Sequence, residues 1–215
     1  HGTLTMSAGT INTGSWVSIG RSTGNGIMNV SGGTLNKTNG GSSFIVGDGS
    51  TGALNQTNGV INTTGEVWIG SNTSSGTYNM SGGTLSADNW FVVGRNGGSV
   101  GTINMTAGTI TKGGANDLVL GADAGTASGT INLSGGLINV TAGATNIGKN
   151  GGTGTLTLSG TADFRTSQMI VGVGTGIGTV NLNGGTLQTP KLNGGAGTSA
   201  VNFNGSTLLA TADSI

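Results

Sequence analysis

"GTLTMSAGTIN" (residues 2–12) returns with small changes as "GTINMTAGTIT" (101–111) and "GTINLSGGLIN" (129–139). Aligned on Gly-Thr-apolar-Asn-apolar-Ser, the chain contains eight copies and a degenerate ninth that begins near Ser199. The eight copies begin at Gly2, Gly26, Gly52, Gly76, Gly101, Gly129, Gly154 and Gly178. Neighbouring copies are about 24–25 residues apart, and an internal period of this size is typical of solenoids and other repeat architectures.

Each copy contains three short segments in which apolar and polar residues alternate. In the first copy these are Thr3–Ser7, Thr10–Asn12 and Trp16–Ile19, each followed by a turn or loop rich in Gly, Ser, Asn and Thr. Such alternation predicts half-buried β-strands. One copy offers only about five inward apolar side chains, which it cannot bury alone, whereas stacked copies can. We therefore predict an all-β, right-handed parallel β-solenoid (β-helix) with three short strands per coil, about eight coils and no helix.

The alternation assigns the side chains that face the core. In the first segment they are Leu4/Met6, Met28/Val30, Leu54/Gln56, Tyr78/Met80, Ile103/Met105, Ile131/Leu133, Leu156/Leu158 and Val180/Leu182. In the second segment they are Ile11, Leu35, Ile61, Leu85, Ile110, Ile138, Ala162 and Leu187. In the third segment they are Val17/Ile19, Phe44/Val46, Val67/Ile69, Phe91/Val93, Leu118/Leu120, Thr145/Ile147 and Met169/Val171. All five methionines are inward, and only Gln56, Thr145 and the small Ala162 weaken the pattern.

The final coil, from about residue 186, is degenerate. Pro190 cannot donate to a strand ladder, and the third segment shrinks to "PKLNGG" (190–195). We expect a single solenoid domain over residues 1–215. Solenoids need caps because an open end is an unpaired strand edge, and the repeat starts at once. We therefore expect a piece of a longer chain, the alternative being a unit that stacks end to end.

The composition excludes several classes of protein. The formal net charge is +0 and only 7% of residues are charged, so there is no basic surface for nucleic acid. No apolar run is long enough to cross a membrane as a helix, and we expect no membrane insertion. Cysteine is absent, which excludes disulfides and thiolate metal sites.

The sequence contains no recognisable constellation for chemistry. Its seven acidic residues are scattered singly, mostly in loops or turns: Asp48, Glu66, Asp88, Asp117, Asp123, Asp163 and Asp213. Glu66 and Asp117 share one position two coils apart, hence about 10 Å from each other. His1 is the only histidine, so no serine-hydrolase triad can form. We predict no enzyme, no catalytic residue, no metal site and no cofactor.

Two outer faces carry a regular Thr/Asn array. Threonine and asparagine recur at outward positions of the first segment, at Thr3, Thr77, Thr102, Thr130, Thr155, Thr179, Asn79, Asn104, Asn132 and Asn181. Stacked β-branched residues suit a pleated surface and suffice as a structural explanation. A flat array of this kind could also order water, so ice binding is an alternative function.

The third segment differs because apolar residues also point outward. The candidate interaction face consists of Trp16, Ile45, Trp68, Trp90, Val92, Val119 and Ile170. A contiguous exposed apolar surface usually marks an interaction site. Three interpretations remain open: a loop or neighbouring domain covers the face, another chain packs laterally on it, or its tryptophans stack on a glycan. Beyond this strand we interpret a further column of residues as a solubilising rim. It consists of Arg21, Asp48, Ser71, Arg95, Ala122, Lys149 and Val173.

The repeat resembles a known group of sequences. "GTLTMSAGTIN" (2–12), "GTYNMSGGTLSADNWFVVGRNGG" (76–98) and "GTLTLSG" (154–160) are similar to the autotransporter-associated β-strand repeats and related repeats of large bacterial surface proteins. The resemblance covers residues 2–209 and implies an exported bacterial passenger or surface β-solenoid, commonly adhesive or structural. Its motif is short and low in complexity, so it specifies architecture better than function.

The expected function is that of a non-enzymatic structural or adhesive β-solenoid, used as a surface stalk, fibre or filament subunit. Its expected location is extracellular or on the bacterial cell surface. Its expected partners are other copies of itself, end to end or laterally, neighbouring domains of the same chain, or a surface glycan. A glycan-binding module that uses the outward tryptophan and aliphatic face is the main alternative.

Overall fold

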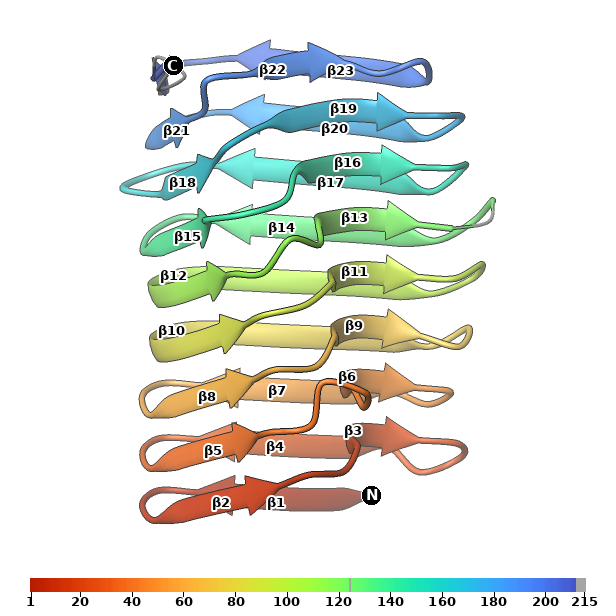
Figure 1. Cartoon of the computed structure of the whole chain (residues 1–215), viewed down its shortest axis with the longest axis vertical. Helices are drawn as coiled ribbons and strands as arrows, with labels where there is room; N and C mark the ends of the chain where they lie inside the picture. Colours follow the sequence, from red (N-terminus) through yellow and green to blue (C-terminus); the bar gives the residue numbers. More distant parts are fainter. Residues whose placement is uncertain (124, 212–215) are drawn as a thin grey trace.

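The computed structural model describes residues 1–123 and 125–211. These residues form 24 β-strands and no helix. The strands stack in coils along one axis, with the N-terminus at one end of the stack and the C-terminal strands at the other (Figure 1). The predicted parallel β-solenoid of about eight coils is confirmed.

The strands fall into the three predicted segments. The first-segment strands are β1 (Gly2–Met6), β4 (Gly26–Val30), β7 (Gly52–Gln56), β14 (Ser128–Leu133), β17 (Thr153–Leu158), β20 (Ile177–Leu182) and β23 (Thr198–Phe203). The second-segment strands are β2 (Thr10–Thr13), β5 (Thr34–Lys37), β8 (Val60–Thr63), β15 (Leu137–Val140), β18 (Asp163–Thr166), β21 (Thr186–Gln188) and β24 (Thr207–Leu209). In the middle coils, β10 (Ser75–Ala87) and β12 (Val100–Lys112) run through both segments. The third-segment strands are β3 (Val17–Arg21), β6 (Phe44–Asp48), β9 (Val67–Ser71), β11 (Phe91–Arg95), β13 (Leu118–Ala122), β16 (Thr145–Lys149), β19 (Met169–Val173) and β22 (Leu192–Gly194).

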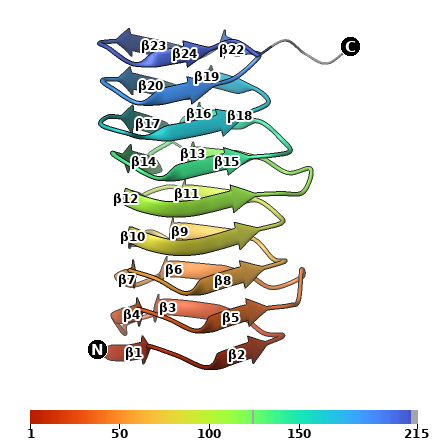
Figure 2. The same cartoon turned by 90° about the vertical axis from the view of Figure 1, so that its left-hand side faces the viewer.

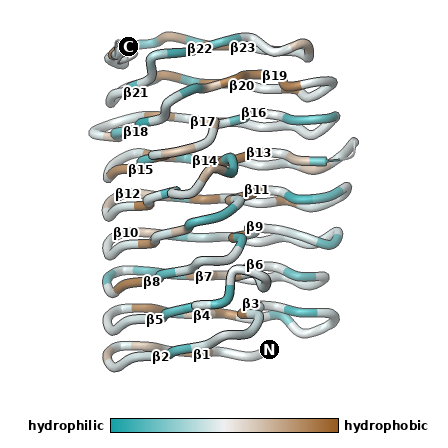
Figure 3. Tube along the Cα trace, in the orientation of Figure 1, coloured by the Kyte–Doolittle hydropathy of each residue, from teal (hydrophilic) through white to brown (hydrophobic). Residues whose placement is uncertain are grey.

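All ladders between these strands are parallel, and each joins equivalent residues of successive copies. Gly2 lies opposite Gly26, and Thr102 lies opposite Thr130. The first and second segments form one 16-stranded sheet, and the third segment forms an eight-stranded sheet. Figure 2 shows the second-segment strands in a single column, and Figure 3 shows apolar and polar segments recurring from coil to coil. A repeated sequence therefore becomes a set of columns parallel to the axis.

The predicted inward side chains form one continuous core. All five methionines are buried, as are the first-segment pairs from Met28/Val30 to Val180/Leu182. Leu4 is 47% exposed because β1 has a neighbouring first-segment strand, β4, on one side only. Even the short strand β22, which follows Pro190, pairs with β19, so the degenerate coil keeps the register of the stack.

The predicted alignment of the seventh coil is wrong by two residues. Ala162 is buried, but Phe164 and not Ala162 lies opposite Ile138. A shift of two residues keeps each side chain on the same face of the strand. It places a phenyl ring, rather than a methyl group, in the inward column, while Asp163 still faces outward and pairs with Arg165 at 2.6 Å.

Gln56 is accommodated in the core because its carboxamide has a complete set of partners. The Tyr78 hydroxyl donates to Gln56 Oε1 at 2.5 Å. Gln56 Nε2 donates to the carbonyl oxygens of Gly59 and Thr84, both at 3.1 Å. Thr145, the other polar inward residue, donates to Thr166 Oγ1 at 3.0 Å. A buried polar group without a partner costs about 1–3 kcal/mol, and these groups avoid that cost.

Two lysines that the sequence pattern missed are also buried. Lys37 and Lys112 end β5 and β12, where the fourth residue of the second segment again points inward. The Lys112 ammonium donates to the carbonyl oxygens of Gly113, Gly114, Asn116 and Ala142, and the Lys37 ammonium donates to that of Asn39. Burial lowers the pKa of both lysines, and Asp117 and Asp88 oppose this shift for Lys112. Each ammonium supplies donors to the carbonyls of the adjoining loop.

One corner of every coil is closed by two facing glycine columns. The first lies near the end of the third-segment strand, as at Gly47 in β6 and Gly70 in β9, where φ is 80° and 76°. The second begins the first strand, as at Gly76. A Cβ on Gly76 would lie 1.9 Å from the Val46 carbonyl oxygen and 2.3 Å from the Gly70 nitrogen. Only glycine lets the two sheets approach this closely.

Gly76→Ala tests this corner. The added methyl group has no space between two backbones, so we expect the free energy of unfolding to fall by more than about 3 kcal/mol. Gly14→Ala is the control, because Gly14 has no positive φ and a Cβ there would meet nothing within 4 Å. Urea denaturation measures both variants, and equal losses would contradict the steric argument.

Tyr78 predicts an alkaline limit to stability. Burial raises the pKa of its hydroxyl above the usual value near 10. Above about pH 10 the unfolded chain releases the Tyr78 proton, whereas the folded chain keeps it. The free energy of unfolding therefore has its full value below about pH 10 and falls as the pH rises above it. Tyr78 is the only tyrosine. Phenolate absorbance should therefore appear together with the loss of β-sheet circular dichroism, and phenolate formation in the folded state would contradict this.

Candidate functional site

The outer side of the eight-stranded sheet carries the predicted apolar face, and the chain's own side chains largely cover it. Ile45, Val92 and Val119 are at most 5% exposed. Trp68, Trp90 and Ile170 are half-buried, whereas Trp16 is 48% exposed. The face is therefore not a bare apolar strip. Tryptophans and long charged side chains form a second layer over its aliphatic residues.

One part of this layer is centred on Trp68. The Arg95 guanidinium lies 3.8 Å from the centre of the Trp68 ring, and the Trp16 ring meets Trp68 edge-on at 5.9 Å. Trp68 Nε1 and Arg95 Nη1 both donate to Glu66 Oε2, at 2.7 and 3.1 Å. A cation over an aromatic face is stabilising, the more so when it is partly desolvated. Arg95 is thus held in place by stacking and by an ion pair.

A second part of the layer is centred on Trp90. Lys149 Nζ lies 4.9 Å from the centre of the Trp90 ring and 3.9 Å from Asp117 Oδ2. Asp117 also accepts hydrogen bonds from the Ala144 backbone nitrogen at 2.9 Å and from Asn146 Nδ2 at 2.8 Å. Asp117 is therefore a structural acceptor, and Lys149 bridges three successive coils.

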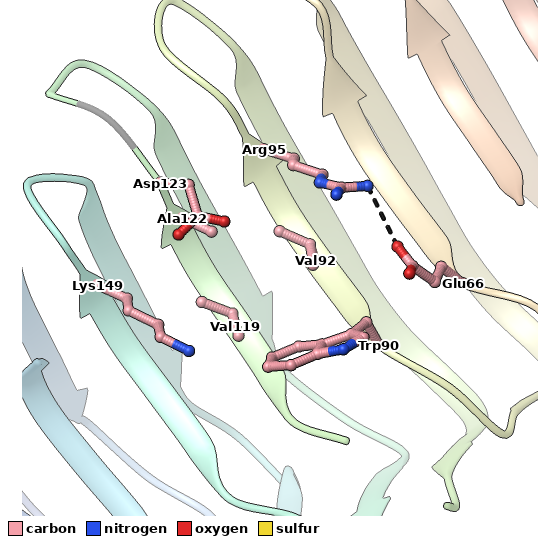
Figure 4. A pocket seen from close by; sticks show the side chains of 8 residues that line it. All are labelled: Glu66, Trp90, Val92, Arg95, Val119, Ala122, Asp123 and Lys149. Atoms are coloured by element: carbon pink, nitrogen blue, oxygen red, sulfur yellow. Dashed lines mark hydrogen bonds and ion pairs between the residues drawn. The ribbon is translucent and has the colours of Figure 1, made fainter.

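Between these two clusters lies a pocket of about 100 Å³. Val92, Val119 and Ala122 form its apolar part, Trp90 forms one side, and Glu66, Arg95, Asp123 and Lys149 surround it (Figure 4). The charged residues of this pocket belong to positions that the sequence pattern assigns to a solubilising rim or to scattered acids. A signal was present in the sequence, because Glu66 precedes Trp68 by two residues and Arg95 follows Trp90 by five.

The Thr/Asn array forms hydrogen-bonded ladders. Asn55, Asn79, Asn104 and Asn132 each donate from Nδ2 to Oδ1 of the asparagine one coil earlier, at 2.9–3.0 Å. Asn181 donates at 3.4 Å to Thr157 Oγ1, where the ladder has a threonine. Thr3 is exposed, and Thr77, Thr102, Thr130, Thr155 and Thr179 are half-buried outward residues of the same strands. The amides of the array thus bind each other along the axis.

The acidic residues that the structure describes do not gather into a site for a metal ion. In residues 1–123 and 125–211, no three His, Asp or Glu side chains lie close enough together to hold one. Glu66 and Asp117 are engaged in separate clusters, and Asp213 lies outside the described residues. Within the same residues no helix could span a membrane.

No known protein family, curated protein or solved structure matches the chain. The resemblance to autotransporter-associated repeats stays a prediction from the residues that carry it.

Asn79→Ala tests whether the ladder stabilises the fold. Asn79 donates to Asn55 and accepts from Asn104, and each hydrogen bond contributes about 0.5–1.5 kcal/mol. We expect urea denaturation to show a loss of about 1–3 kcal/mol. The control is Asn139→Ala, which removes an outward asparagine of β15 that lies opposite Thr111 and Arg165 and therefore belongs to no ladder of asparagine side chains. Equal losses would show that the hydrogen bonds of the asparagine ladder contribute nothing beyond what any outward asparagine of a strand contributes.

Proposed function

We propose that the chain is a non-enzymatic rod displayed outside the cell, where it serves as a stalk, fibre or adhesive passenger. The observation that carries this proposal is the unbroken stack of in-register parallel ladders, which run from β1 to β23 in the larger sheet and from β3 to β22 in the smaller one. Such a stack transmits load along its axis through backbone hydrogen bonds in every coil. The resemblance to bacterial surface repeats supports an extracellular location.

The end rungs of the described stack support association along the axis. Leu4 in β1 and Phe203 in β23 are 47% and 55% exposed. Each of these strands has a hydrogen-bonded neighbour on one side only. Such an edge is a template for another strand. We propose that further coils add there, from the same chain or from another copy.

Ice binding is supported less well. Water-ordering surfaces need regularly spaced groups that are free to bind water, whereas the asparagine amides of this array are committed to one another along the axis. Thermal hysteresis of the purified chain tests this alternative. Thermal hysteresis that is present in the parent chain and is abolished by both Asn79→Ala and Thr102→Val would favour ice binding over a purely structural array.

Pulling on the two ends of the purified chain in a force microscope tests the rod. Each coil contacts only its neighbours, so a solenoid can unfold by repeats. We expect successive steps that each release about 24–25 residues, which is about 80 Å of extended chain. A single all-or-none event would contradict a rod made of mechanically separable coils.

Antibody binding to intact cells of the source organism tests the location separately. An antibody raised against the folded chain should label intact cells as strongly as permeabilised cells, and added protease should remove the label. Label that requires permeabilisation would contradict an extracellular rod, whatever the mechanical result.

A further inference from the structure

The pocket beside Trp90 exists because one residue of a repeated column is small. Arg95 lies opposite Ala122 in the ladder between β11 and β13, and Lys149 ends the next strand, β16. Long side chains thus occupy this column in the coils before and after, whereas a methyl group occupies it at Ala122. The missing side-chain volume opens about 100 Å³ above Val92 and Val119.

Two of the groups around this opening, Arg95 and Trp90, are held in place. The Arg95 guanidinium is fixed by Trp68 and Glu66. The Trp90 backbone nitrogen donates to Asn89 Oδ1 at 2.8 Å, and its carbonyl oxygen accepts from the Val67 nitrogen at 2.9 Å. The Trp90 ring packs against the buried cluster that includes Val92 and Val119. Groups fixed before binding lose little conformational entropy when a ligand arrives.

The charges of the pocket are balanced. Two cations, Arg95 and Lys149, face two carboxylates, Glu66 and Asp123. An anionic ligand would meet both carboxylates, and a cationic ligand would meet both cations. A purely apolar ligand would remove water from these charged groups and offer them no hydrogen-bond partner of its own, which is costly. The pocket therefore selects a neutral ligand.

Donors and acceptors remain for such a ligand. Arg95 donates to Glu66 through Nη1 only, so its other N–H groups are available to a ligand. Glu66 accepts these hydrogen bonds through Oε2, so its Oε1 is available to a ligand. Asp123 forms no hydrogen bond or ion pair with any other described residue and is exposed. The Lys149 ammonium lies over one face of the Trp90 ring, and its long side chain can move aside and donate to a ligand instead. Hydroxyl groups, which both donate and accept, complement this mixture.

We propose that this pocket binds one ring of a neutral sugar. A pyranose ring combines apolar C–H faces, which stack on an indole ring, with a rim of hydroxyl groups, which fit two cations and two carboxylates. The size of the pocket limits the contact to one ring, with the rest of a glycan outside. This proposal rests on the pocket alone and does not depend on the rod function.

Ala122→Leu tests the proposal by filling the pocket without changing a charge. Larger side chains stand in this column in other coils, among them Arg95, Lys149 and Val173, so the coil should still fold. Val173→Leu places the same side chain at the same column position two coils away, where it adds one carbon atom and not three. Circular dichroism and thermal unfolding should show both variants folded. Trp90→Ala removes the stacking surface, and Trp16→Ala is its matched control on the same face.

Saturation-transfer NMR should be run with glucose, galactose, mannose and N-acetylglucosamine, each added singly, and with glucuronate and glucosamine as charged counterparts. At least one neutral sugar should bind, with a dissociation constant of about millimolar, as expected for so small a ligand. Ala122→Leu and Trp90→Ala should weaken binding at least tenfold, and the two controls should bind like the parent chain.

Three results would overturn the proposal. The first is no transfer to any of the four neutral sugars. The second is unchanged binding by folded Ala122→Leu and Trp90→Ala, which would place the sugar elsewhere. The third is tighter binding of glucuronate or glucosamine than of the corresponding neutral sugar, which would contradict the balanced charge of the pocket.

Discussion

The close approach of two backbones at the glycine corner sets the shape of every coil. Where a Cβ on Gly76 would touch the carbonyl oxygen of Val46, the two sheets are nearly in contact, and no side chain separates them. Backbone fills the corner itself, and the inward side chains begin one or two residues away from it, at Tyr78 in one sheet and at Ile69 in the other. The core therefore begins beyond the two glycine columns.

The regular core tolerates large polar residues such as Gln56, Tyr78 and Lys112 because each of them has hydrogen-bond partners. Gln56 and Tyr78 come from adjacent coils and satisfy each other across one rung. The Lys112 ammonium donates both to carbonyl groups of its own loop and to the carbonyl oxygen of Ala142 in the next coil. Hydrogen bonds between coils thus accompany the backbone ladders inside the stack as well as outside it, where the asparagine ladders run. Removing one partner would leave a buried group unsatisfied.

Most of the fold could be predicted from the sequence because the same pattern of apolar and polar residues occurs in eight copies. A period-2 pattern that recurs in register identifies the inward columns without any knowledge of the loops. The errors lie where one copy departs from the template. Phe164 replaces Ala162 in the seventh coil because a shift of two residues preserves the alternation, so the pattern alone cannot detect it. Lys37 and Lys112 were missed because charge is normally a sign of exposure, and only the positions of loop carbonyls show that an ammonium can be satisfied inside.

The candidate site was harder to predict because it, too, lies where single copies depart from the repeat. The sequence shows which side chains point outward from β9, β11 and β13, but not that Arg95 and Lys149 bend back over the tryptophans. Identical rungs produce identical surfaces, so a repeated template cannot build a unique pocket. A pocket requires neighbouring rungs that differ, and Ala122 between Arg95 and Lys149 is such a difference. In a solenoid, rigidity comes from the core and ladder residues that recur in every coil. Selective binding must come from positions at which neighbouring coils carry different residues.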